Sequence, residues 1–193
     1  MKELIRQRFL DSIETKQKVI ENDALVSTIA ATADAMAEVI ANGGKILLCG
    51  NGGSASDALH IAGEIVGRFQ KERKSWPAVV LNADVATLTA IANDYGYDNA
   101  FARQVEGFMT EKDLLIGITT SGNSENIYRA IVKAKEIGGK TAVLTGRTGG
   151  KTAPIVDFPL VVPCDVTARI QESHITIGHI MCEIVEEKLA EKQ

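Results

Sequence analysis

The sequence predicts an α/β fold in which a doubly wound, five-stranded parallel sheet forms the middle of three layers. From residue 45 onward, short apolar runs alternate with helical patterns, and this alternation builds a parallel sheet covered on both faces. Gly- and Ser-rich tracts follow the first and third apolar runs. Such tracts are typical of the turns that lead from a strand into a helix in a sheet of this kind.

Length and composition indicate one globular domain. A chain of 193 residues can bury a full core, so we expect a single domain over 1–193, with helices over 1–41 and an α/β core over 42–193. A net charge of −4 without a basic stripe argues against nucleic acid as a partner. No apolar stretch approaches 18 residues and the N-terminus lacks a signal-peptide core, so we expect a cytoplasmic protein with no membrane partner.

The three cysteines support this expectation. They are odd in number, widely spaced and set among apolar residues, which favours buried, reduced thiols over a disulfide. They are Cys49, Cys164 and Cys182.

The first 41 residues carry apolar side chains at helical spacing. They predict an N-terminal helical extension made of two helices, or of one long helix broken near Asn22-Asp23. Asn42-Gly43-Gly44 ends the second helix.

The rest of the chain predicts five strands and five helices. Apolar runs place the strands at 45–49, 78–81, 114–118, 141–144 and 159–162. Helical spacing places the helices at 54–67, 84–93, 98–110, 125–137 and 168–190. The tetrapeptide Asn93-Asp94-Tyr95-Gly96 is expected to be a loop. We expect the strand order 2-1-3-4-5, which reverses between strands 1 and 3.

Two polar loops adjoin this point of reversal. The first is Gly50-Asn51-Gly52-Gly53-Ser54 after strand 1, and the second is Thr119-Thr120-Ser121-Gly122-Asn123-Ser124 after strand 3. Backbone N–H groups and hydroxyls at helix N-termini bind anions, so the two loops predict a phosphate site between them. The alternative is that their Ser and Thr side chains only cap helices. The chain has no P-loop motif.

The helix after the first loop carries His60 and Glu64 on one face, at i,i+4 spacing. A His and a Glu so placed can ligate zinc, or one of them can serve as a proton-transfer base. Spacing alone favours the alternative, a solvated polar face.

The C-terminal helix adds a second group of polar residues. Gln171 and His179 lie about two turns apart and roughly 80° around the helix axis, so both can point into one site. The spacing does not decide whether His174 or His179 faces inward, and packing or surface roles for both stay open. Zinc suits these residue types, but periodicity does not establish it.

Taken together, these segments resemble the phosphoheptose isomerases, which are sugar isomerase (SIS) domain enzymes. The similarity runs from the N-terminal helices to His179. The matching segments are Cys49-Gly50-Asn51-Gly52-Gly53-Ser54, His60-x-x-x-Glu64, Asn93-Asp94-Tyr95-Gly96, Thr120-Ser121-Gly122-Asn123-Ser124 and Arg169-Ile170-Gln171-Glu172-x-His174. Enzymes of this family convert sedoheptulose 7-phosphate to D-glycero-D-manno-heptose 7-phosphate.

The resemblance implies a role for each matching residue. One zinc ion (Zn2+) per subunit would be bound by His60, Glu64, Gln171 and His179. Glu64 and His179 would also be the catalytic proton-transfer pair, and His174 would be a packing residue. The substrate-binding residues would be Asn51, Gly52, Gly53, Glu64, Asn93, Asp94, Thr119, Thr120, Ser121, Ser124 and Gln171.

Two departures from the family pattern affect the expected phosphate site. Thr119 stands where the family usually has serine, and its added methyl group would tighten the pocket slightly. Glu125 puts a carboxylate beside Ser124, which is an electrostatic objection unless the side chain points to solvent.

The resemblance leaves two other functions open. One is a non-catalytic SIS-domain protein, either a sugar-phosphate sensor or a relative of the replication-initiator-associating proteins, and the four metal positions argue against it. The other is an isomerase acting on a hexulose 6-phosphate. The family also implies a homotetramer, with the N-terminal helices packed between subunits and the sites near subunit interfaces.

Overall fold

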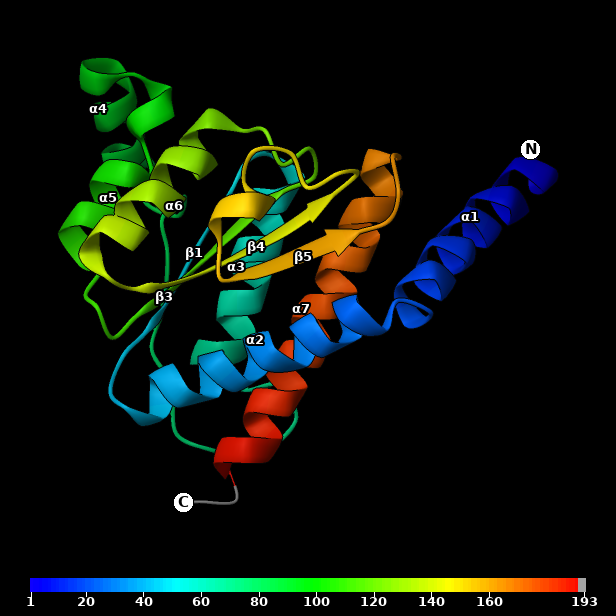
Figure 1. The fold of residues 1–193 in the computed structure, drawn as a ribbon, viewed down its shortest axis with the longest axis horizontal. Helices are drawn as coiled ribbons and strands as arrows, with labels where there is room; N and C mark the ends of the chain where they lie inside the picture. Colours follow the sequence, from blue (N-terminus) through cyan, green and yellow to red (C-terminus); the bar gives the residue numbers. More distant parts are fainter. Residues whose placement is uncertain (191–193) are drawn as a thin grey trace.

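The computed structural model describes residues 1–190 and shows a parallel sheet between two groups of helices (Figure 1). The five strands have the order β2-β1-β3-β4-β5, and every neighbouring pair is parallel. The predicted fold class and strand order are therefore confirmed. The strands are β1 (Ile46–Gly50), β2 (Ala78–Val80), β3 (Leu114–Thr119), β4 (Lys140–Gly146) and β5 (Phe158–Val162).

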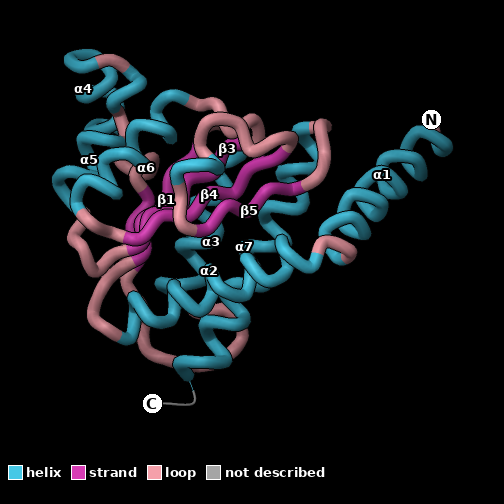
Figure 2. Tube along the Cα trace, in the orientation of Figure 1, coloured by secondary structure: helices cyan, strands magenta, loops and turns pink. Residues whose placement is uncertain are grey.

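Helices cover both faces of the sheet (Figure 2). Helices α2, α3 and α7 share one hydrophobic cluster with the sheet, and α5 and α6 share the other. The helices are α1 (Lys2–Ile20), α2 (Asp23–Ala41), α3 (Gly53–Val66), α4 (Val85–Tyr95), α5 (Ala102–Phe108), α6 (Glu125–Ile137) and α7 (Thr167–Ala190). Two short 3-10 turns are η1 (Tyr97–Asn99) and η2 (Ala153–Ile155).

The strands alternate between the two clusters, because successive side chains of a strand point to opposite faces. In β1, Ile46 and Leu48 face α2, α3 and α7, while Leu47 and Cys49 face α5 and α6. All four side chains are fully buried. The continuous apolar runs in the sequence therefore reflect burial on both faces of the sheet.

The segment 93–96 differs from expectation, because α4 continues through Asn93 and Asp94 to Tyr95. The helix starts at Val85, within one residue of the expected start, and its N-cap residue Asp84 accepts a hydrogen bond from the N–H of Thr87 through its side chain. It ends at Gly96, which has a φ of +81°. The expected helix 98–110 is shorter and consists of the 3-10 turn η1 followed by α5.

Helix α2 corrects the expectation that no apolar stretch approaches 18 residues. It has 19 residues and a mean hydropathy of 1.5, so by length and composition alone it is long and apolar enough to cross a membrane. Its apolar side chains, such as Ile29 and Met36, belong to the core cluster that includes α7 and β5. A core helix of a soluble protein passes the same test of length and composition.

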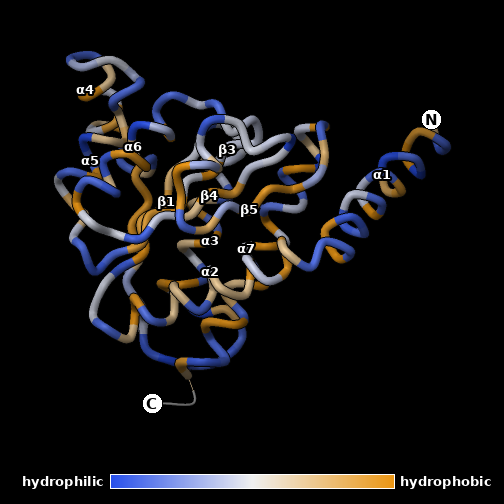
Figure 3. The backbone as a smooth tube through the Cα atoms, viewed as in Figure 1, coloured by the Kyte–Doolittle hydropathy of each residue, from blue (hydrophilic) through white to orange (hydrophobic). Residues whose placement is uncertain are grey.

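Helix α1 projects from the body of the molecule (Figure 1). Its turns carry hydrophobic residues, visible as orange segments in Figure 3, and these side chains are exposed. We name them the α1 apolar face: Leu4, Ile5, Phe9, Leu10, Ile13 and Ile20. Exposed apolar surface of this extent is typical of an interaction surface.

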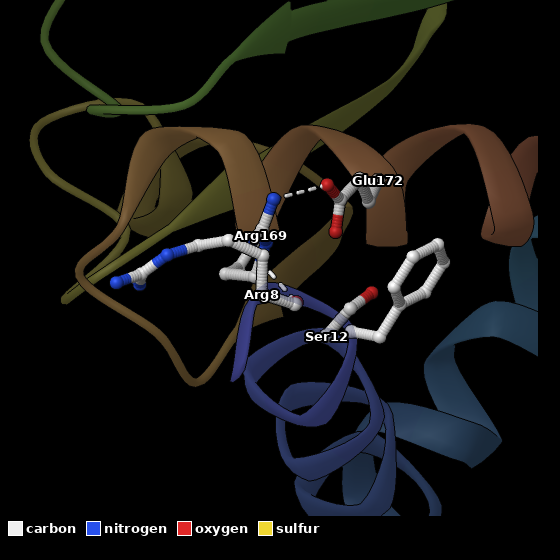
Figure 4. A pocket seen from close by; sticks show the side chains of 5 residues that line it. Arg8, Ser12, Arg169 and Glu172 are labelled. Atoms are coloured by element: carbon white, nitrogen blue, oxygen red, sulfur yellow. Dashed lines mark hydrogen bonds and ion pairs between the residues drawn. The ribbon is translucent and has the colours of Figure 1, made fainter. Parts of the chain in front are cut away.

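The contact between α1 and α7 is polar. The Arg169 side chain donates a hydrogen bond to the carbonyl oxygen of Arg8 and forms an ion pair with Glu172. These residues line a hollow with Phe9 and Ser12 (Figure 4). This hollow adjoins the α1 apolar face.

All three cysteines are free thiols, but they are not equally buried. Cys49 and Cys182 are buried, and burial raises the pKa of each to about 12. Cys164 is only half-buried, so the expectation of three buried thiols is wrong for this residue. It follows β5 in the segment that leads to α7, at the edge of the sheet.

His174 attaches α7 to the sheet. The side chain is fully buried, and its Nε2 lies 3.0 Å from the carbonyl oxygen of Thr145 in β4. Burial lowers its pKa to about 4. This placement confirms the packing role expected for His174.

We expect His174 to make the protein sensitive to acid. In the folded protein it stays neutral down to about pH 4, whereas the unfolded chain binds a proton near the ordinary pKa of 6.5. Lowering the pH from 7 to 5 should therefore reduce the free energy of unfolding by roughly 2 kcal/mol through this residue. In urea unfolding at pH 7 and at pH 5, the free energy of unfolding of the His174→Gln variant should not show this decrease. A pH dependence equal to that of the wild type would contradict the prediction.

Candidate functional site

The two polar loops begin side by side. Gly50 at the end of β1 is paired with Ile118 in β3, so both loops leave the sheet at the same edge. A reciprocal pair of amide hydrogen bonds joins Asn51 to Asn126 in the first turn of α6, at 3.0 and 2.9 Å. The Tyr97 hydroxyl also donates to Asn51 Oδ1, at 2.8 Å. The sequence prediction that the loops meet at the reversal of strand order is confirmed.

The first loop needs glycine for two different reasons. Gly52 has φ +56° and ψ −123°, a backbone conformation that residues with a side chain rarely adopt. Gly53 leaves room for Gln171, because a Cβ atom there would lie 2.5 Å from Nε2 of that side chain. The first turn of α3 therefore begins directly beside a residue of α7.

The second loop gathers hydroxyl groups. Thr119 Oγ1 lies 2.9 Å from Ser124 Oγ and 3.5 Å from Ser121 Oγ. Ser124 is the N-cap residue of α6, yet its side chain makes no capping hydrogen bond. The alternative that this hydroxyl merely caps the helix therefore does not hold for Ser124, whose hydroxyl pairs with Thr119 at the N-terminus of α6 instead.

Glu125 is neutralised by two neighbouring cations. Its carboxylate forms ion pairs with Lys151 and, at 2.7 Å, with Arg129. Hydrogen bonds from Lys151 and Arg129 lower the pKa of Glu125. The electrostatic objection to an anion beside Ser124 is therefore weak, because the negative charge of Glu125 is already compensated.

Three side chains from two helices meet about two turns along α3 from the first loop. His60 Nε2 lies 3.2 Å from Glu64 Oε1 on α3 and 2.9 Å from His179 Nε2 on α7. One ligand atom from each of the three lies within 4.8 Å of the others. His60 is exposed, and Glu64 and His179 are half-buried. Of the two histidines that the spacing of α7 left open, His179 faces the site and His174 does not.

This arrangement fits a zinc ion. Zinc binds His nitrogen and carboxylate oxygen at about 2.0–2.2 Å in tetrahedral geometry, which places ligand atoms about 3.3 Å apart. The separations of 3.2 and 2.9 Å are close to that value. Two imidazoles and one carboxylate form a donor set that zinc enzymes use.

Gln171, on α7, contacts the turn of α3 that precedes His60. Its Nε2 is 3.5 Å from Oδ1 of Asp57, a residue one turn before His60. Asp57 is 7% exposed, and its other carboxylate oxygen has no hydrogen-bond partner among the described residues. Burial raises the pKa of Asp57.

Asn93 and Asp94 lie apart from the groups described so far. They occupy the last turn of α4, where Asn93 Nδ2 donates to Asp94 Oδ1 at 2.8 Å. Asp94 lines a hollow with Arg103 and Phe108 of α5. Helix α4 has no buried residue, and it stands at the margin of the molecule in Figure 1.

The sequence analysis missed two residues of the loop region. Asn126 is 3% exposed although it is polar, and such a residue in the first turn of a helix after a Ser-rich loop is a usable signal. Asp57 lies three residues before His60 and therefore on a neighbouring part of the same helix face, which also could have been noticed.

Comparison with known proteins agrees with this geometry. The model of the SIS domain family matches residues 8–146. A phosphoheptose isomerase of Helicobacter pylori (strain P12) is 50% identical over 190 residues, covering 98% of both chains. A phosphoheptose isomerase of Aquifex aeolicus (strain VF5) is 48% identical over 192 residues, covering 100% of both chains.

A solved structure gives the same result. The phosphoheptose isomerase of Neisseria gonorrhoeae superimposes with a TM-score of 0.91 at 42% sequence identity, covering 96% of this chain and 98% of that one. The chain belongs to the SIS-domain family and, within it, to the phosphoheptose isomerases.

Proposed function

We propose that the protein isomerises D-sedoheptulose 7-phosphate to D-glycero-D-manno-heptose 7-phosphate in bacterial heptose biosynthesis. The observation that carries this proposal is the convergence of His179, on α7, with His60 and Glu64 on α3, the helix that starts from the first of two loops suited to a phosphate. The near full-length relatives named phosphoheptose isomerase support the choice of substrate.

The second loop would anchor the substrate. Hydroxyls of Thr119, Thr120, Ser121 and Ser124, with the N-terminus of α6, would hold the phosphate. Asn51, Gly52 and Gly53 would contact the sugar, together with Asn93 and Asp94. Binding at the remote phosphate would orient the reacting carbons near Glu64 and His179.

The reaction moves a proton between adjacent carbons through an enediol(ate). Glu64 would take the carbon-bound proton, and His179 would transfer the proton to and from the substrate oxygen. The metal ligands would be His60, Glu64, Gln171 and His179. The distances from His60 to Glu64 and to His179 support three members of this set, and Gln171 is included from the resemblance. Zinc, when bound, polarises a carbonyl group and stabilises negative charge on its oxygen. Glu64 would therefore have two tasks, since it both holds the metal and accepts the proton.

The Glu64→Gln variant tests the chemistry. We expect its kcat to fall at least about 100-fold, because an amide cannot accept the proton. The assay follows aldose formation from sedoheptulose 7-phosphate, with and without a chelator, and Glu183→Gln on the exposed side of α7 is the matched control. Wild-type protein that shows no turnover with added zinc would overturn the proposed function, and binding without turnover would point to a sensor.

Phosphate anchoring is tested by the Ser124→Ala variant. A hydrogen bond to a charged group contributes about 1.5–3 kcal/mol, so we expect KM to rise about tenfold or more. Inhibition by inorganic phosphate should weaken in parallel, whereas Ser27→Ala on the exposed side of α2 should change neither quantity. If the KM of Ser124→Ala equals that of the wild type, Ser124 does not bind the phosphate.

We also infer that residues 1–193 act as one SIS domain, in a soluble homotetramer with sites near the subunit interfaces. The α1 apolar face supports subunit contacts, because these side chains have no cover in the single chain. The lack of buried residues in α4, which carries Asn93 and Asp94, supports a site completed by a neighbouring subunit. The cytoplasmic location stays a prediction.

Light scattering tests the assembly. We expect a mass of four chains for the wild type. The double variant Phe9→Asp, Ile13→Asp should dissociate into smaller species, because it places charges on the α1 apolar face. A monomeric wild type would contradict the assembly and leave the proposed chemistry to be judged on the activity assay.

A further inference from the structure

A buried ion pair lies at the far end of the metal-site helices. The side chains of Arg73, in the loop after α3, and Glu186, in α7, are each 2% exposed. Arg73 Nε and Glu186 Oε1 are 3.1 Å apart. Burying two charges costs desolvation free energy, which further hydrogen bonds to the two side chains must offset. The partners in these hydrogen bonds show which segments the ion pair connects.

Arg73 binds the C-terminal end of α3. Its Nη2 donates to the carbonyl oxygen of Glu64 at 2.7 Å, and its Nη1 donates to that of Ile65 at 3.1 Å. A third contact reaches the carbonyl oxygen of Gly67 at 3.4 Å. These carbonyls are at the negative end of the helix dipole, where a cation is stabilising. The backbone of Glu64 is thus held directly by the guanidinium group.

Glu186 binds the loop that follows α3. Its two oxygens accept hydrogen bonds from the backbone N–H groups of Phe69, Gln70 and Lys71, at 3.1, 2.7 and 2.7 Å. The Phe69 ring stacks on His179, with 5.8 Å between centroids and 30° between planes. Glu186 lies seven residues after His179, which places both on one face of α7.

We propose that Arg73 and Glu186 are positioning residues for the metal site. The pair ties the end of α3 to α7 at the Glu64 backbone, and it fixes the turn that presses Phe69 against His179. It therefore sets the separation between Glu64 and His179, to which both metal binding and proton transfer are sensitive. This inference rests on the proposed function.

A second buried carboxylate offers a matched control. Asp113 is 1% exposed, pairs with Lys45 at 2.7 Å and accepts backbone N–H groups from Lys45 and Thr110. It is a buried, ion-paired carboxylate like Glu186, but its partners Lys45 and Thr110 precede β1 and β3, and neither belongs to α3 or α7. Asp113→Asn should therefore reduce stability without reaching the metal site.

The experiment compares Glu186→Gln, Arg73→Lys and Asp113→Asn in the full chain. Zinc affinity is measured by competition with a chromophoric chelator, stability by urea unfolding of the metal-free protein, and kcat and KM with sedoheptulose 7-phosphate. We expect Glu186→Gln and Arg73→Lys to bind zinc about tenfold more weakly, as outer-shell changes do, with a lower kcat and a KM within about twofold. Asp113→Asn should keep the zinc affinity of the wild type.

The outcomes separate the two proposals. If the wild type binds no zinc and gives no turnover, the proposed function fails, and this inference fails with it. If the wild type binds zinc but Glu186→Gln and Arg73→Lys bind it equally well, only the positioning role is overturned. An equal loss of affinity in Asp113→Asn also overturns it. Arg73→Lys keeps a cation beside Glu186 and decides the question if Glu186→Gln does not fold.

Discussion

The parallel pairing of β1 with β3 is the constraint on which the site depends. It starts both loops at one edge of the sheet, and the Asn51–Asn126 amide pair then locks them together. The loops would otherwise be two separate helix N-termini about seventy residues apart in the sequence. Because β1 and β3 are fully buried, both loops start from the rigid core of the sheet.

The sequence was sufficient to predict the elements whose signals are local. Apolar runs located the strands, and the limits of α6 were predicted to the residue because Ser124 precedes it and Gly138 follows it. The prediction that His60 and Glu64 share one helix face was correct as well, because residues at i,i+4 spacing are neighbours on any α-helix.

The contacts that complete the site have no local signal. His179 meets His60 across 119 residues of sequence, and helical spacing did not distinguish it from His174. The difference arises from packing. His174 faces the sheet at Thr145, while the lack of a side chain at Gly178 lets α7 approach Ile61 of α3 closely. The end of α4 was mispredicted for a related reason, because its apolar pattern stops before the helix does.

The loop that connects α3 to β2 contains a built-in reporter. Trp76 is the only tryptophan in the chain, it is 4% exposed, and the Arg73 guanidinium carbon lies 3.6 Å from its ring centroid. Indole emission responds to nearby charge, so a displacement of Arg73 changes the intrinsic fluorescence of the protein. The state of the connection between α3 and α7 can therefore be followed in solution without a label.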